Sequence, residues 1–193
     1  MDQYASRDNL ERSLQIGNEQ LAIAALKKAK KVTRRRYLDL ILDVLNTTHS
    51  FRLRNAAAIA VADLDSNDAK RLLIDLLERK DTKKSQGTLL YALDEAGASI
   101  PIDILTRVIT TSRFEAREEA VRFLESRKVV WKPEKLENSI KRLQRMTTSR
   151  NIERSQVAKR ALRLASALSR NNGPGGSRRR RAEPITIKRA SSD

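Results

Sequence analysis

Apolar residues along this chain follow a helical period. The segment AKRLLIDLLERK, Ala69 to Lys80, has its leucines at i, i+1, i+4 and i+5, which is one face of an α-helix: Leu72, Leu73, Leu76 and Leu77. The residues Ser66-Asn67-Asp68 precede this segment and carry the side-chain oxygens that cap helix N-termini. No segment alternates apolar and polar residues for long. The pattern therefore predicts an all-α protein with almost no strand.

Segments of similar build recur at a spacing of 31 residues. They are LRNAAAIAVADL (Leu53 to Leu64), KSQGTLLYALDE (Lys84 to Glu95) and EAREEAVRFLES (Glu115 to Ser126). The complementary helices between them are Tyr37 to Leu45, Ala69 to Lys80, Pro101 to Ile109 and Pro133 to Met146. A repeat of this length is typical of stacked antiparallel helix pairs, in which each unit is too small to bury its own apolar face. We therefore expect neighbouring units to share one elongated core.

Other residues mark where these helices begin. Pro101 and Pro133 stand near the first helical position, where a missing N–H costs nothing. The spacing of Ser112 and Glu115 matches a capping box.

The two ends of the chain differ from the repeats. Residues 1–35 predict an N-terminal capping helix or hairpin, broken near Gly17-Asn18 and followed by a basic turn, and residues 36–170 predict the helical repeats. The last helix has a predicted buried face of Val157, Ala161, Leu164, Ala165 and Leu168. Residues 171–193 are rich in glycine and arginine and have too little apolar surface to offset the entropy of ordering, so we expect a disordered basic tail.

The helical-pair period and the alanine-rich second helix Asn55 to Ala60, entered by Leu53-Arg54, resemble the HEAT repeats of the HEAT/armadillo class. The resemblance covers roughly residues 36–168. It implies a right-handed α–α superhelix, or solenoid, that binds proteins or nucleic acids. The family often places an arginine early in the second helix. Arg54 matches this position and Arg117 approximates it, whereas the region near Ser85 has no arginine.

Positive charge is concentrated toward the C-terminus. The net charge of +16 favours an acidic partner such as nucleic acid, an anionic membrane surface or an acidic protein. Residues 51–111 carry nine basic and nine acidic side chains, residues 131–170 carry 11 and three, and residues 171–193 carry six and two. The middle of the chain is therefore neutral and its last third is basic.

Three basic elements are candidates for contact with phosphate or an acidic partner. They are the turn KKAKKVTRRR, one face of each of the last two helices, and the arginine block of the tail. Their residues are Lys27, Lys28, Lys30, Lys31, Arg34, Arg35 and Arg36; Lys135, Arg142, Arg145, Lys159, Arg163 and Arg170; and Arg178, Arg179, Arg180 and Arg181. Each element also has a simpler interpretation, because cations favour helix C-termini and a terminal repeat needs a polar outer face.

Catalysis has weak support in the sequence. The chain has no cysteine and a single histidine, His49, which excludes thiolate nucleophiles, zinc–thiolate sites and metal centres built on several imidazoles. The paired carboxylates Asp63-Asp65, Asp94-Glu95 and Glu118-Glu119 have the simpler interpretation of solvated helix surface. Trp131 is either a core residue between repeats or a stacking residue. We predict no catalytic residue, metal or cofactor.

The first functional interpretation is a non-enzymatic scaffold or adaptor that binds a partner protein, with basic ends that favour acidic partners. The alternative is a nucleic-acid-binding protein with weak sequence selectivity, since seven aromatic residues are too few for a base-stacking platform. A HEAT-like DNA glycosylase or lyase is a distant third. With no apolar run long enough to span a bilayer and no secretory signal, we expect a cytoplasmic protein, or a nuclear one if the source is eukaryotic.

Overall fold

The computed structural model of the chain describes the backbone of residues 2–171 and the side chains of residues 7–170. The predicted disordered tail, with Arg178 to Arg181, lies outside the described residues. The helices are α1 (Asp2–Gln15), α2 (Glu19–Lys28), α3 (Lys31–Arg36), α4 (Leu38–Thr47), α5 (Phe51–Ala62), α6 (Asn67–Glu78), α7 (Gln86–Glu95), α8 (Ile102–Thr111), α9 (Phe114–Ser126), α10 (Pro133–Thr147) and α11 (Ile152–Asn171). The prediction of an all-α fold is confirmed for this part of the chain.

The expected scarcity of strand is also confirmed. The short segments β1 (Ile100–Pro101) and β2 (Val129–Val130) pair in parallel, with Ile100 opposite Val129. They belong to the connections that precede α8 and α10, so the bridge joins two successive connections on one edge of the molecule.

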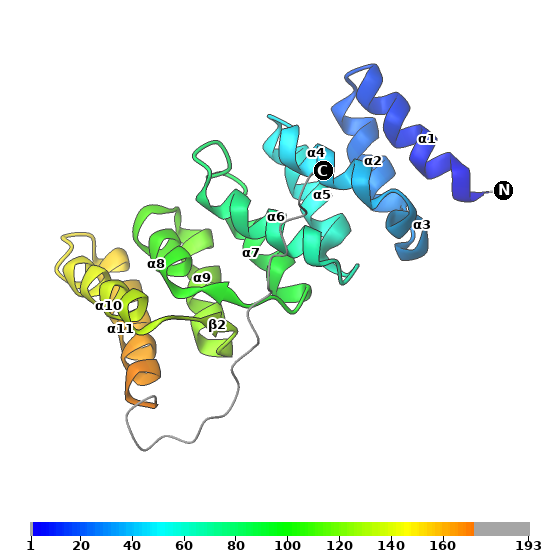
Figure 1. Ribbon diagram of the computed structural model, residues 1–193. Helices are drawn as coiled ribbons and strands as arrows, with labels where there is room; N and C mark the ends of the chain where they lie inside the picture. The colour runs from blue at the N-terminus through cyan, green and yellow to red at the C-terminus, as the bar shows by residue number, and fades with distance from the viewer. Residues whose placement is uncertain (1, 172–193) are drawn as a thin grey trace, which may run out of the picture.

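Consecutive helices pack against each other in order. The helices α4 and α5, α6 and α7, α8 and α9, and α10 and α11 form pairs. Each second helix also contacts the next second helix, from α5 to α7, α9 and α11, and the first helices α4, α6, α8 and α10 do the same. Figure 1 shows the pairs following one another from α1 to α11. The hairpin of α1 and α2 is joined to this array through the contact between α2 and α5.

One continuous core runs through these pairs, as the apolar period predicts. In α6, Leu73, Leu76 and Leu77 are buried and Leu72 is half-buried. In α5 the buried side chains are largely alanines, whose small size allows neighbouring helices to approach closely. The predicted face of α11 is buried or half-buried along its length. Each helix therefore contributes to a core that extends beyond its own pair.

Most predicted helix starts agree with the structure. The Ser66 hydroxyl accepts a hydrogen bond from the Ala69 amide at 3.2 Å, and Pro133 is the first residue of α10. The break near Gly17 is also present: Gly17 has a φ of +68°, in the left-handed region that glycine favours, and Asn18 caps α2.

The predicted capping box at Ser112 and Glu115 is wrong. Helix α9 begins at Phe114, its N-cap residue Arg113 makes no side-chain cap, and the Ser112 hydroxyl instead donates to Oε1 of Gln86 at 2.6 Å. The buried amide of Gln86 in α7 needs a hydrogen-bond partner, and Ser112 supplies it.

Finally, none of the helices that the structure describes is long and apolar enough to cross a membrane.

Candidate interaction surfaces

Two arginines of the predicted basic turn bind acceptors at the end of α5. Arg34 donates to the Ala60 carbonyl at 2.8 Å and to the Asp63 carboxylate at 3.0 Å, and Arg35 donates to the Leu64 carbonyl at 3.0 Å. These acceptors lie at the C-terminal end of α5, where carbonyls lack helical partners and the helix dipole favours cations. Arg34 and Arg35 therefore fasten α3 to the end of α5.

The lysines of the same turn have a different environment. Lys27, Lys28, Lys30 and Lys31 are exposed, and none of their ammonium groups forms a hydrogen bond or an ion pair with any residue that the structure describes. Arg36 is exposed as well. The four lysines can reach an external anion without first losing a partner among residues 7–170.

Part of the charge on the last helix pair is neutralised, including that of Lys141, which pairs with Glu137 within α10 at 2.6 Å. Lys135 pairs with Asp103 of α8 at 2.9 Å, so this candidate residue joins α10 to α8. Arg160 bridges Glu118 and Glu125 of α9, at 2.9 and 2.8 Å. These contacts connect α10 and α11 to the preceding pair.

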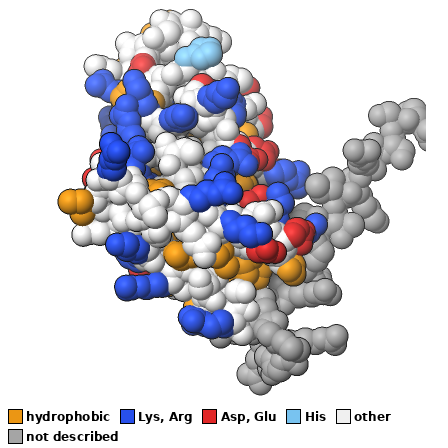
Figure 2. Space-filling view, turned by 90° about the vertical axis from the view of Figure 1, so that its left-hand side faces the viewer, with side chains coloured by type: hydrophobic (Ala, Val, Ile, Leu, Met, Phe, Trp, Pro, Cys, Tyr) orange, Lys and Arg blue, Asp and Glu red, His pale blue; other side chains and the backbone are white. Residues whose placement is uncertain are grey.

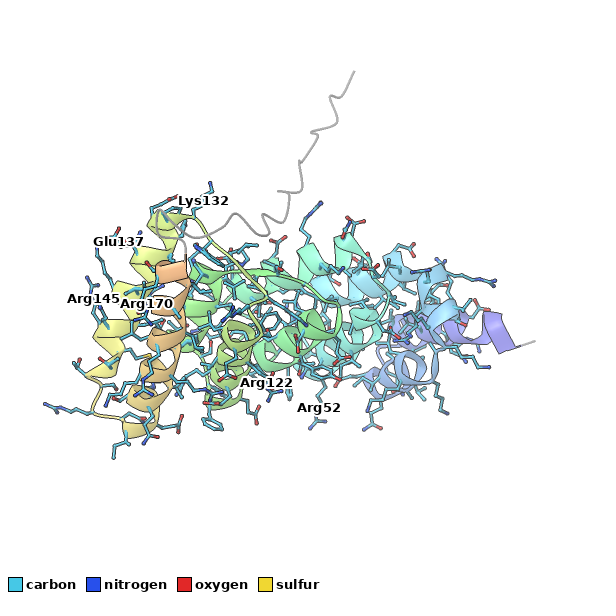
Figure 3. All side chains as sticks on the ribbon, turned by 90° about the horizontal axis from the view of Figure 1, so that it is seen from below. Arg52, Arg122, Lys132, Glu137, Arg145 and Arg170 are labelled. Carbon is cyan, nitrogen blue, oxygen red and sulfur yellow. The ribbon has the colours of Figure 1, made fainter. Side chains whose placement is uncertain are left out.

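The remaining cationic side chains of the last pair are exposed and form no ion pair or hydrogen bond within residues 7–170. We call them the end surface: Lys132, Arg142, Arg145, Arg150, Arg154, Lys159, Arg163 and Arg170. Blue side chains gather on this end of the molecule in Figure 2. Figure 3 places Lys132, Arg145 and Arg170 around the same end. Five of these residues were predicted to lie on exposed helix faces, and their side chains are exposed: Arg142, Arg145, Lys159, Arg163 and Arg170.

A groove of about 280 Å³ lies between α8 and α10, beside the end surface. Arg142, Arg145 and Lys141 border it, together with Asn138. Thr106 also lines the groove, and its buried hydroxyl has no hydrogen-bond partner among the described residues. Unpaired buried hydroxyls are uncommon in folded proteins. The groove therefore combines cationic side chains with an unused polar group.

Five of the six paired carboxylates considered as catalytic alternatives form ion pairs. Asp63 pairs with Arg34, Asp65 with Lys70, Asp94 with Lys128, Glu118 with Arg160 and Glu119 with Arg122. A hydrogen bond from Lys70 lowers the pKa of Asp65 below its usual value. The ion pairs of Asp63, Asp94 and Glu118 join segments that are separate in the sequence.

The other singled-out residues have ordinary surroundings. His49 is exposed in the turn between α4 and α5, and Trp131 is half-buried against the core. In the described range, no three or more His, Cys, Asp or Glu side chains gather in a way that could hold a metal ion.

Arg54 and Arg117, which the sequence places in the HEAT pattern, belong to a series of buried polar side chains that was not predicted. Arg54, near the start of α5, donates to the Thr48 carbonyl at the end of α4 and to the Asp81 carboxylate of the next pair at 3.3 Å. Burial lowers the pKa of Arg54, while Asp81 opposes this effect. A hydrogen bond from Arg79 in turn lowers the pKa of Asp81.

The next two second helices repeat this arrangement. Gln86 of α7 donates to the Leu77 carbonyl at 2.9 Å and accepts from Ser112. Arg117 of α9 donates to the Ser112 carbonyl at 2.8 Å and pairs with Glu153 of α11 at 2.9 Å. In each case one polar side chain joins its own pair to the next one. The sequence signal for this series is the near-regular spacing of residues 54, 86 and 117.

A second groove, of about 480 Å³, crosses the turns of three successive pairs. We call it the turn groove. The α4–α5 turn contributes Phe51, the α6–α7 connection contributes Lys80, Lys83 and Lys84, and the α8–α9 turn contributes Arg113. In Figure 1 these turns lie along one edge of the molecule, its upper edge. The sequence did not predict this groove, because most of the residues that line it belong to residues 51–111, which carry no net charge.

Comparisons with known proteins found solved structures that are similar to this chain. No protein-family model matches the chain, and no curated protein matches it. One crystal structure of an engineered protein is 17% identical, with 81% of this chain and 78% of the other covered and a TM-score of 0.45. A second engineered protein is 18% identical, with coverage of 77% and 75% and a TM-score of 0.39.

Proposed function

We propose that this chain is a non-enzymatic, HEAT-like helical scaffold that binds an acidic partner protein at its end surface. The ordered pairs, in which first helices contact first helices and second helices contact second helices, support a HEAT-like superhelix. The buried polar series that begins at Arg54 also supports it, since this arginine matches the HEAT pattern. A stack of this kind offers a long surface to a partner.

The observation that carries the proposal is the unpaired charge of the end surface. Lys135, Lys141 and Arg160 of the same pair have carboxylate partners within the chain, but the end-surface cations have none among the described residues. A terminal repeat needs a polar outer face, and a mixture of both signs would satisfy that need. An excess of one sign favours association with a surface of the opposite sign.

A protein fits this surface better than a nucleic-acid backbone. Glu134 and Glu137 are exposed on α10 among the cations, and Glu137 pairs with Lys141 at 2.6 Å. A regular row of phosphates would meet repulsion at these carboxylates, whereas a partner protein can place its own positive or neutral groups there. The arginine guanidinium groups of Arg142 and Arg145 are also suited to two-pronged hydrogen bonds with carboxylates.

Nucleic acid is the second candidate, and the basic turn favours it. Lys27, Lys28, Lys30 and Lys31 are exposed without a partner in the described part of the chain, and no carboxylate lies among them in the sequence. Binding through such lysines would be sensitive to salt and nearly independent of base sequence.

Affinity capture from extracts of the source cells, with and without nuclease, separates the two candidates. The bait is compared with an end variant, R142Q/R145Q/R163Q, and with a control variant of equal charge change at exposed positions elsewhere, R12Q/R71Q/R122Q. We expect a protein partner that survives nuclease, is lost from the end variant and is kept by the control. A partner that disappears after nuclease treatment would support the second candidate, and equal retention by both variants would contradict the proposed surface.

A further inference from the structure

The turn groove is lined by positive charge, although residues 51–111 as a whole carry no net charge. Lys80, Lys83, Lys84 and Arg113 are exposed, and within the described residues none of their side chains forms a hydrogen bond or an ion pair. The carboxylate in the groove, Asp81, is already bound by Arg79, with hydrogen bonds of 3.0 and 2.7 Å, and by Arg54. The acidic residues that make residues 51–111 neutral in total therefore do not neutralise the groove.

Exposed aromatic rings accompany these cations. Phe51 is 41% exposed and Phe114 is 52% exposed, and each is the first residue of its helix on the edge of the turns. The Lys84 ammonium lies 5.6 Å and the Arg52 guanidinium 5.9 Å from the centre of the Phe51 ring. Phe114 directly follows Arg113, which lines the groove. Cations and aromatic faces thus occur together at two turns that border one groove.

We propose that the turn groove binds single-stranded nucleic acid, with phosphates at Lys80, Lys83, Lys84 and Arg113 and bases stacked on Phe51 and Phe114. Positively charged grooves with aromatic faces are the means by which proteins hold single strands without reading their sequence. An acidic peptide would use the cations and leave the rings without a planar partner. The bases of a duplex are already stacked on one another, so a duplex cannot use the rings either.

This site is separate from the end surface, and it stands without the proposed function. The residues that line the groove lie at the start of α5, in the α6–α7 connection and in the α8–α9 turn, and Phe114 is the first residue of α9, whereas the end surface belongs to α10, α11 and their flanking turns. Variants of the two surfaces can therefore be compared in the same chain.

Fluorescence anisotropy with a labelled oligothymidylate and the full chain at low salt tests the site. K80Q/K83Q/K84Q should weaken binding at least about tenfold and should make the salt dependence shallower by about two units of slope, since each phosphate contact to a single strand contributes about 0.7. F51L/F114L should weaken binding by about tenfold or more while the slope stays the same, because stacking contributes about 1–3 kcal/mol per base.

The controls are the end variant R142Q/R145Q/R163Q, which should bind the oligonucleotide nearly as the natural chain does, and circular dichroism, which should show that every variant is folded. Absence of binding at low salt would overturn the proposal. Loss of most of the affinity in the end variant, or no effect of F51L/F114L, would overturn it too. Competition by polyglutamate as strong as that by the unlabelled oligonucleotide would indicate a site for acidic peptides and would also overturn it. Loss of the captured protein partner in the end variant alone bears on the proposed function and not on this groove.

Discussion

Leu76→Ala should lower the free energy of unfolding by about 2–5 kcal/mol, the usual cost of truncating a fully buried leucine. The Leu76 side chain has no exposed surface, and its helix α6 packs against α4, α7 and α8. The substitution removes apolar contacts and leaves a cavity that neighbouring helices can fill only in part. Because the core is continuous, we expect the array to unfold at a lower urea concentration, as followed by circular dichroism.

The matched control is Leu72→Ala on the same helix. Leu72 is half-buried, so its truncation should cost clearly less than that of Leu76. Equal denaturation midpoints for the natural chain and Leu76→Ala would show that α6 does not pack in this way.

Arg117→Ala should destabilise the protein by about 2–3 kcal/mol, the order of one charged hydrogen bond together with a carbonyl left unpaired. Its guanidinium holds the Ser112 carbonyl at the end of α8 and reaches Glu153 on α11. The arginine side chain is 7% exposed, whereas the Glu153 side chain is 50% exposed. The buried contact to the carbonyl should therefore matter more than the ion pair.

Glu153→Ala separates these two contributions. An ion pair with a half-exposed carboxylate stabilises a protein by about 1 kcal/mol at most, and water can replace the lost partner. Arg117→Lys should also be costly, since an ammonium group cannot reproduce the geometry of the guanidinium. A Glu153→Ala loss as large as that of Arg117→Ala, measured by urea denaturation, would contradict the role assigned to the carbonyl contact.

The fold could be predicted from the sequence because the spacing of apolar residues records which face of each helix is buried. Leu73, Leu76 and Leu77 are buried as the period of α6 predicts. Ser66 and Pro133 mark helix starts because their effects are local. Ser112 misled the prediction, since its hydroxyl bonds to Gln86, which is 26 residues away. A local motif says nothing about a competing partner from another helix.

The candidate surfaces could be predicted only in part, because a cation is free only if no carboxylate or carbonyl reaches it in the folded chain. Arg34 and Lys135 were grouped with the free cations, yet their partners stand 29 and 32 residues away in the sequence. The turn groove could not be predicted for the same reason, because the net charge of residues 51–111 is zero. Asp81 is neutralised by arginines outside the groove, which leaves the groove lysines unpaired.

Zero-length carbodiimide cross-linking of the captured complex, followed by mass spectrometry, tests the proposed partner surface most directly. The reagent joins a lysine amine to a carboxylate in contact with it, and Lys132 and Lys159 are the lysines of the end surface. We expect cross-links from these two lysines to aspartate or glutamate residues of the partner protein. Cross-links that involve Lys70 or the Lys27–Lys31 cluster, with none at Lys132 or Lys159, would contradict it.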